Sequence, residues 1–196
     1  MKIFTAISGA LGLLLSTSSL GAFTTSVPEQ DAFFDLIRAH CGKAYQGTVV
    51  SGGRAGDGFS DQRLVMHVRE CTDDQIKIPF HVGDNHSRTW ILTKTGAGIL
   101  LKHDHRHKDG SNDESTMYGG HTQHRGWANA QSFPADDYSK DLFTRLGFPQ
   151  SNGNTWHMYI YPEVFTYQLT REGRDFKVDF DLTQPVDLPP VPWGYQ

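Results

Sequence analysis

Short segments in which apolar and polar residues alternate recur along the chain, and they constrain its fold more than any other feature. In the clearest segment, apolar side chains occupy every second position from Ile76 to Val82, with Pro79 among the residues between them. This period of two is typical of a strand with one buried face. Because proline has no backbone N–H to donate, Pro79 predicts an edge position or a bulge.

Turn-forming residues separate the segments of this kind, which predict about nine or ten strands. The predicted strands lie in residues 42–50, 64–68, 76–82, 88–94, 99–107, 116–118, 128–133, 156–161, 164–170 and 176–180. Successive strands with hairpin-like turns favour an antiparallel sheet, and closure into a barrel removes its exposed edges. The sequence therefore predicts a mainly β fold with a single antiparallel β-barrel. A β-sandwich is the alternative.

Two helices are expected besides the strands. Pro28 suits the first turn of a helix, and the apolar residues Phe33, Ile37 and Cys41 follow at intervals of four. These three would form one buried stripe, so the first helix is expected to reach Cys41. The second helix is predicted over residues 135–146, where apolar residues again share one face.

The N-terminal residues differ in composition from the rest of the chain. Residues 1–22 combine a positive start at Lys2 with an apolar, small-residue centre and a small-residue cleavage site. These features indicate a secretory signal peptide and predict an exported protein, periplasmic or secreted. Residues 23–196 are then expected to form a single domain. Its proline-rich tail, residues 184–196, is expected to lie extended with its aromatic side chains against the body.

Cys41 and Cys71 are the only cysteines of the chain. In an oxidising compartment such a pair favours a disulfide. A bridge between them would close a loop of roughly 31 residues, which stabilises the fold by about 3–4 kcal/mol on the chain-entropy estimate. The alternative is two buried free thiols.

The stretch from Lys102 to Asp109 is the densest block of chemically capable side chains in the sequence. It continues a predicted strand, so His103, His105 and His107 would share one face while Asp104 and Arg106 share the other. The preceding residues, 99–101, are apolar on both faces and leave two orientations open. Either the histidines line the barrel interior, or the interior receives Lys102, Asp104 and Arg106 and is able to anchor an acidic ligand.

Histidines two residues apart on a strand form a recurrent metal chelate, and imidazole suits Zn, Cu, Ni and Fe. His103 and His105, completed by His121, are therefore candidate ligands of a divalent metal such as Zn. The alternative is a solvated or hydrogen-bonded face of the strand. A cavity beside this strand is expected to have Trp90, Tyr118 and Trp156 in its wall.

The stretch from Gly42 to Val49, with Tyr45 and Gly47, resembles the opening of calycin-type barrels, the lipocalin and fatty-acid-binding-protein group. Tyr45 stands where a tryptophan is usual. The chain also resembles a family of uncharacterised exported bacterial proteins. The segments that carry this second resemblance are 78–84, 90–93 and 102–107. It implies a bacterial periplasmic or secreted setting and no particular activity.

The leading functional hypothesis is the binding of a small apolar or amphiphilic ligand in the barrel, with Trp90, Arg106, Tyr118 and Trp156 as ligand-binding residues. One alternative is a metal-binding protein or metal-dependent enzyme that uses residues 103–107. A structural or partner-binding envelope protein is another. The Gly-x-Ser-x-Gly and His-Glu-x-x-His signatures are absent, which weighs against an enzyme. The formal net charge of −4 indicates no nucleic-acid partner.

Overall fold

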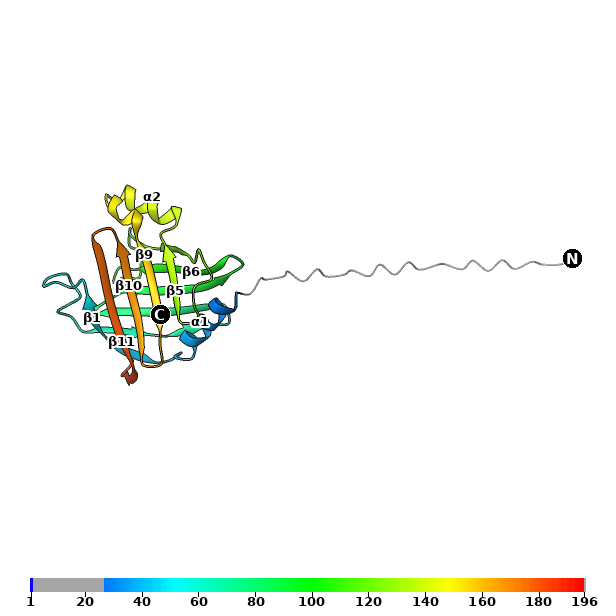
Figure 1. The fold of residues 1–196 in the computed structure, drawn as a ribbon, viewed down its shortest axis with the longest axis horizontal. Coiled ribbons are helices and arrows are strands. Elements are labelled where there is room, and N and C mark those ends of the chain that lie inside the picture. The colour runs from blue at the N-terminus through cyan, green and yellow to red at the C-terminus, as the bar shows by residue number, and fades with distance from the viewer. Residues whose placement is uncertain (2–26, 196) are drawn as a thin grey trace.

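Antiparallel strands are the main elements of the structure, a computed structural model that describes Met1 and residues 27–195 (Figure 1). The predicted signal peptide, apart from Met1, lies outside the described residues. The strands are β1 Ala44–Ser51, β2 Leu64–His67, β3 Glu70–Cys71, β4 Gln75–Val82, β5 Asn85–Thr95, β6 Gly98–His105, β7 Tyr118–His121, β8 Ala130–Pro134, β9 Thr155–Ile160, β10 Val164–Arg171 and β11 Arg174–Val186.

These strands form one nearly closed barrel. Their order in the sheet is β7-β6-β5-β4-β2-β1-β11-β10-β9-β8, all neighbours are antiparallel, and β3 adds to β4 beside β2. The first and last strands of the chain, β1 and β11, pair in the middle of this order, so β7 and β8 are the two edge strands that approach each other. The predicted mainly β, antiparallel barrel is confirmed.

The barrel closes where β7 approaches β8, and a serine of the following helix holds this seam together. A side chain at Gly120 would place its Cβ 1.8 Å from the Pro134 carbonyl oxygen, so only glycine allows the two strands to come this close. The Gly119 N–H donates to Ser139 Oγ at 2.7 Å, and the Gly119 carbonyl accepts from the Asp136 N–H at 2.8 Å. At this seam, hydrogen bonds to the start of the following helix thus take the place of a regular ladder of hydrogen bonds between the two strands.

Two α-helices and a short 3₁₀ helix accompany the sheet: α1 Pro28–Arg38, α2 Asp137–Arg145 and η1 Pro149–Gly153. Both predicted helices are present, but α1 ends three residues before Cys41. The Gly42 N–H instead donates to the Val68 carbonyl at 2.7 Å, and the Val68 N–H donates to the Lys43 carbonyl. These bonds to a distant segment end the helix and leave Cys41 exposed in the turn that follows.

Helix α1 packs at the end of the barrel where β5 turns into β6. Its buried residues are Gln30, Phe33, Phe34 and Ile37. The Gln30 amide donates to Thr122 Oγ1 at 3.0 Å, and the Lys94 ammonium lies 5.0 Å from the centre of the Phe34 ring. This end of the barrel is therefore filled by apolar side chains of the helix and the strands.

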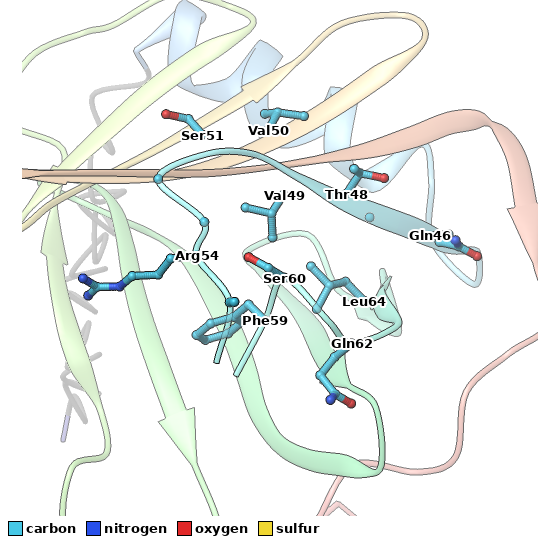
Figure 2. A pocket seen from close by; sticks show the side chains of 14 residues that line it. Gln46, Thr48, Val49, Val50, Ser51, Arg54, Phe59, Ser60, Gln62 and Leu64 are labelled. Atoms are coloured by element: carbon cyan, nitrogen blue, oxygen red, sulfur yellow. The ribbon is translucent and has the colours of Figure 1, made fainter. Parts of the chain in front are cut away.

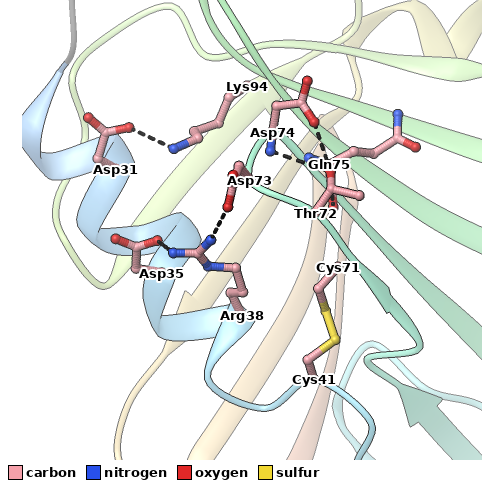
Figure 3. A network of polar contacts seen from close by, with 10 residues as sticks. All are labelled: Asp31, Asp35, Arg38, Cys41, Cys71, Thr72, Asp73, Asp74, Gln75 and Lys94. Atoms are coloured by element: carbon pink, nitrogen blue, oxygen red, sulfur yellow. Dashed lines mark hydrogen bonds and ion pairs between the residues drawn. A yellow bond between two sulfur atoms is a disulfide. The ribbon is translucent and has the colours of Figure 1, made fainter.

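The predicted disulfide is present between Cys41 and Cys71, with a Cα–Cα distance of 6.3 Å (Figure 3). It ties the segment after α1 to β3. Beside it, the Arg38 guanidinium donates to Asp35 and to Asp73, each at 2.9 Å. These ion pairs are exposed and contribute little. The covalent bond is the main link between the helix segment and this strand.

Two prolines occupy strand positions where no donor is required. Pro79 pairs with Thr89 on one side, but on its other side it lies between the residues that pair with β2 and those that pair with β3. The strand β4 is thus interior, and the break in its partner accommodates the proline. Pro185, predicted to lie in the extended tail, belongs instead to β11. It is tolerated there because β10 pairs with β11 only as far as Asp181.

The tail beyond β11 lies on the outer face of the barrel. The Trp193 N–H donates to the His86 carbonyl at 3.0 Å, and the Tyr195 hydroxyl donates to a carboxylate oxygen of Asp104 at 2.6 Å. The Arg69 guanidinium donates to the Tyr195 carbonyl, and Lys77 lies over the Tyr195 ring. The tail packs its aromatic side chains against the body, as the sequence predicts.

Candidate functional site

The interior of the barrel changes from apolar to polar along its axis. Side chains that pair across β4, β5 and β6 form three successive inward-facing rows: Ile76, Leu92, Leu101; then Ile78, Trp90, His103; then Phe80, Arg88, His105. The apolar row lies nearest α1. The row with Arg88 and His105 lies farthest from α1. A ligand in this half of the barrel would meet aromatic and basic groups together.

A cavity of about 270 Å³ occupies this half of the interior. Aromatic side chains dominate its wall: Phe59, Phe80, Trp90, Tyr118, Phe143, Phe148, Trp156, Tyr167 and Phe176. Its volume lies just below the range of roughly 300–1,000 Å³ that is typical of small-molecule sites. Trp90 stacks on Tyr167 with ring centroids 4.5 Å apart, which makes this part of the wall flat and rigid.

Three arginines line the cavity, and no Asp or Glu does. Arg171 donates to Ser151 Oγ and to Asn154 Oδ1, and Arg174 donates to the Gly52 carbonyl. Arg88 differs from both. Its Nη1 is buried without a hydrogen-bond partner among the described residues, and its guanidinium carbon lies 5.4 Å from the centre of the Phe59 ring. The net charge of the wall is therefore positive.

His103 lies at the centre of the wall and is fully engaged within the protein. Its Nδ1 lies 3.2 Å from the Tyr118 carbonyl and its Nε2 lies 2.9 Å from the Tyr167 hydroxyl. A carbonyl only accepts, so Nδ1 carries the proton and Nε2 accepts from Tyr167. Burial lowers the pKa of His103 to about 3, which keeps this imidazole neutral at pH 7.

His105 continues the polar row beside Arg88. Its Nε2 lies 3.1 Å from the Tyr118 hydroxyl. Burial first, and the positive charge of Arg88 second, lower the pKa of His105 to about 4. Burial also raises the pKa of Tyr118 to about 12. At neutral pH both groups are uncharged, so the positive charge of the cavity comes from its arginines.

The structure places three of the four predicted ligand-binding residues on the cavity wall: Trp90, Tyr118 and Trp156. Arg106 is a correction, because it lies on the outer face. Its Nε donates to the two carboxylate oxygens of Asp104 at 2.9 and 3.0 Å. The buried Leu101 belongs to the core, which sets the orientation of the strand and turns Arg106 away from the cavity.

The predicted metal ligands are not brought together. His103 and His105 face the interior, but His121 pairs with Leu100, which lies on the opposite face of β6 from Leu101. In residues 27–195 no group of three or more His, Cys, Asp or Glu side chains is arranged to hold a metal ion. The Nε2 lone pair that His103 would offer already accepts a hydrogen bond from Tyr167.

Sequence reasoning did not single out Arg88 or Tyr167 as site residues. Arg88 belongs to a predicted strand, and the alternation with Trp90 places the two side chains on one face. Trp90 is a large aromatic residue that is expected in the interior, so Arg88, two residues before it, is expected to face the interior too. The inward orientation of Tyr167 can be inferred in the same way, because Phe165, two residues before it, also faces the interior.

A second, more open hollow of about 530 Å³ lies between β1 and the loop of residues 52–63 (Figure 2). Strand β1 pairs with β2 only up to Gly47, so its later residues have β11 alone as a neighbour. In Figure 2 the side chains of Val49 and Leu64 border this gap. Phe59 lines both the hollow and the cavity.

In comparisons with known proteins, no family model, curated protein or solved structure matches the chain. The resemblance of residues 42–49 to calycin-type barrels therefore stays a prediction. Any functional inference rests on the cavity and on the groups that line it.

Proposed function

We propose that the chain is an exported protein that binds a small amphiphilic ligand inside its barrel. The observation that carries this proposal is the cavity of about 270 Å³, which is walled by aromatic rings and has arginines at its polar side. Filled barrels of this size leave no such space, because the interior rows pack to the density of a core. Here one half of the interior is packed and the other half is hollow.

The wall supports an amphiphile in particular. Trp90, Trp156 and Phe143 offer flat apolar surface to the body of a ligand. Arg88 and the Tyr118 hydroxyl lie on the polar side and offer donors to its head. Sites with a mostly apolar wall and a few polar groups that fix orientation are typical of small-molecule binding.

Export is supported by the disulfide and by the N-terminal sequence. The bond between Cys41 and Cys71 requires an oxidising compartment to form and persist. Residues 1–22 carry the composition of a signal peptide. No helix in residues 27–195 has the length and apolar character needed to cross a bilayer.

Binding is tested with N-phenyl-1-naphthylamine, a neutral probe that fluoresces in apolar surroundings. Titration of the mature, disulfide-bonded protein is expected to give saturable fluorescence. Leu169 lines the cavity, so Leu169→Trp fills part of it and is expected to weaken binding about tenfold or more. The matched control is Leu188→Trp, at an exposed position on the tail. Equal probe binding by both variants would contradict the proposal.

A further inference from the structure

Arg88 is a partly buried cationic group that has no counter-ion among the described residues of the cavity wall. Its Nη1 is inaccessible and makes no hydrogen bond in the described part of the chain, and the guanidinium forms no ion pair there. Buried charges are normally paired, because the loss of hydration is otherwise not compensated. An unpaired guanidinium in a binding cavity therefore indicates a group that the ligand satisfies.

Several other arginines of the structure have acceptors for their guanidinium groups. Arg38 pairs with Asp35 and Asp73, and Arg106 pairs with Asp104. Arg171 and Arg174 also line the cavity, but both already donate to protein oxygens. Arg88 alone among the cavity arginines has no such acceptor in residues 27–195.

The neighbours of Arg88 do not neutralise it. Across the sheet it lies between Phe80 and His105, and the Phe59 ring covers it from the loop side. His105 is uncharged at pH 7, and the hydroxyl of Tyr118 carries no charge there. Asp113 acts on Arg88 only at a distance, and its carboxylate accepts hydrogen bonds from Ser115. One positive charge thus remains for the ligand.

We propose that Arg88 receives the carboxylate of a small acid whose flat, apolar body lies against the aromatic wall. This inference rests on the proposed function and names the class of ligand. The guanidinium fork matches a carboxylate in geometry, and a single unpaired cation balances a single negative charge. The body lies toward Trp90 and Trp156, which line the cavity wall.

Two probes of nearly the same shape separate charge from shape: 2-naphthoate and the neutral 2-naphthamide. Binding to the mature protein is followed by calorimetry and by quenching of the fluorescence of Trp90 and Trp156. The naphthoate is expected to bind about tenfold or more tightly than the amide, the size expected of a charge-assisted hydrogen bond. Arg88→Met is expected to remove this preference and to leave amide binding within about twofold.

Two further variants and one melting measurement make the test specific. Arg88→Lys keeps the charge and is expected to retain part of the preference. Arg145→Met removes an exposed arginine that does not line the cavity, and it is expected to leave the preference intact. Arg88→Met should unfold at the same temperature as the unmodified protein or higher, because it removes an uncompensated buried charge.

The outcomes separate this inference from the proposed function. Equal binding of naphthoate and naphthamide to the unmodified protein would leave ligand binding intact and overturn the role of Arg88. A preference that survives in Arg88→Met would overturn it as well. A large fall in the melting temperature of Arg88→Met would mean that the guanidinium serves the fold. Failure of both probes to bind would overturn the proposed function, and the inference with it.

Discussion

At the scale of the residue, His103 acts as a buried hydrogen-bond bridge between two tyrosines of the cavity wall. Replacing it by phenylalanine keeps the aromatic volume but leaves the Tyr118 carbonyl and the Tyr167 hydroxyl without this partner. Each buried polar group without a partner costs about 1–3 kcal/mol. We therefore expect His103→Phe to lower the free energy of unfolding by about 2–4 kcal/mol in urea titrations.

The control for this prediction is His107→Phe. His107 belongs to the same histidine-rich stretch, but 54% of its side chain is exposed. The change is expected to alter stability by no more than about 0.5 kcal/mol. Equal losses in the two variants would contradict the bridging role of His103 and would indicate a general intolerance of phenylalanine in this segment.

The sequence identified the aromatic residues of the site more readily than its charged ones. Trp90, Tyr118 and Trp156 were predicted because large aromatic side chains belong in a barrel interior. Arg106 was misplaced because residues 99–101 are apolar on both faces, so alternation alone did not decide which face is inward. The decision comes from Leu101, which packs in the core against other strands. Arg88 shares the face of Trp90 by alternation within one strand, so local sequence does hold a signal for it.

At the scale of the element, the loop of residues 52–63 contributes Phe59 to the walls of both the cavity and the hollow beside β1, and we expect its ring to act as a gate between them. The ring contacts Phe176 at a centroid distance of 5.2 Å and stacks over Phe80 at 6.3 Å. Phe59→Ala is expected to raise both the association and dissociation rates of 2-naphthoate, on the order of tenfold, with a smaller change in affinity. Stopped-flow fluorescence measures both rates.

A matched variant separates a gate from an ordinary wall residue. Phe148 lines the cavity but not the hollow beside β1. Phe148→Ala is expected to raise the dissociation rate and leave the association rate within about threefold, as is usual for a lost contact. An unchanged association rate in Phe59→Ala would show that the ligand enters by another route.

The tail is a second element whose contribution is testable, through Tyr195. Its hydroxyl donates a hydrogen bond to Asp104 on the outer face of the barrel. Asp104 is only 1% exposed. Hydrogen bonds to charged groups contribute about 1.5–3 kcal/mol, so Tyr195→Phe should destabilise the protein by about that amount. Tyr161→Phe, at an exposed position, serves as the control. Equal stability of both variants in urea would mean that the tail detaches in solution.

Most elements of the fold followed from local sequence patterns, and the exceptions depend on distant contacts. The alternating segments gave nearly all strands because the period of two reports one buried face. The end of α1 was misplaced because it is set by the hydrogen bond from Gly42 to Val68. Pro185 was assigned to the tail because the sequence does not reveal that β11 lacks a neighbour on one side at this position.

At the scale of the whole molecule, buried histidines make the fold sensitive to acid. Burial is the first cause that lowers the pKa of His81 and His105 to about 4, and that of His103 to about 3, from 6.5. These groups stay neutral in the folded protein, whereas the unfolded chain protonates them below about pH 6.5. The unfolded state then binds more protons, so stability falls as the pH falls through this window.

Each such histidine lowers the free energy of unfolding by about 1.4 kcal/mol for each pH unit of acidification, once this histidine is protonated in the unfolded chain. For the three together we expect the free energy of unfolding to fall by about 3–4 kcal/mol between roughly pH 6 and pH 5. Carboxyl groups with a lowered pKa, such as those of Asp113 and Asp136, act in the same direction only at lower pH, near their ordinary value of 3.8. The loss of stability that occurs above about pH 5 therefore comes from the histidines.

His81 provides the sharpest check of this pH dependence, because both of its ring nitrogens are buried without hydrogen-bond partners among the described residues. His81→Leu removes no hydrogen bond recorded there, so its stability at neutral pH should match or exceed that of the unmodified protein. Its free energy of unfolding should also fall less steeply as the pH falls. The difference in slope is expected to be about 1.4 kcal/mol per pH unit, the contribution of one proton. Urea titrations across the window measure this slope. Val191→Leu, at an exposed and non-ionisable position, should keep the full slope, and an undiminished slope in His81→Leu would contradict the assignment.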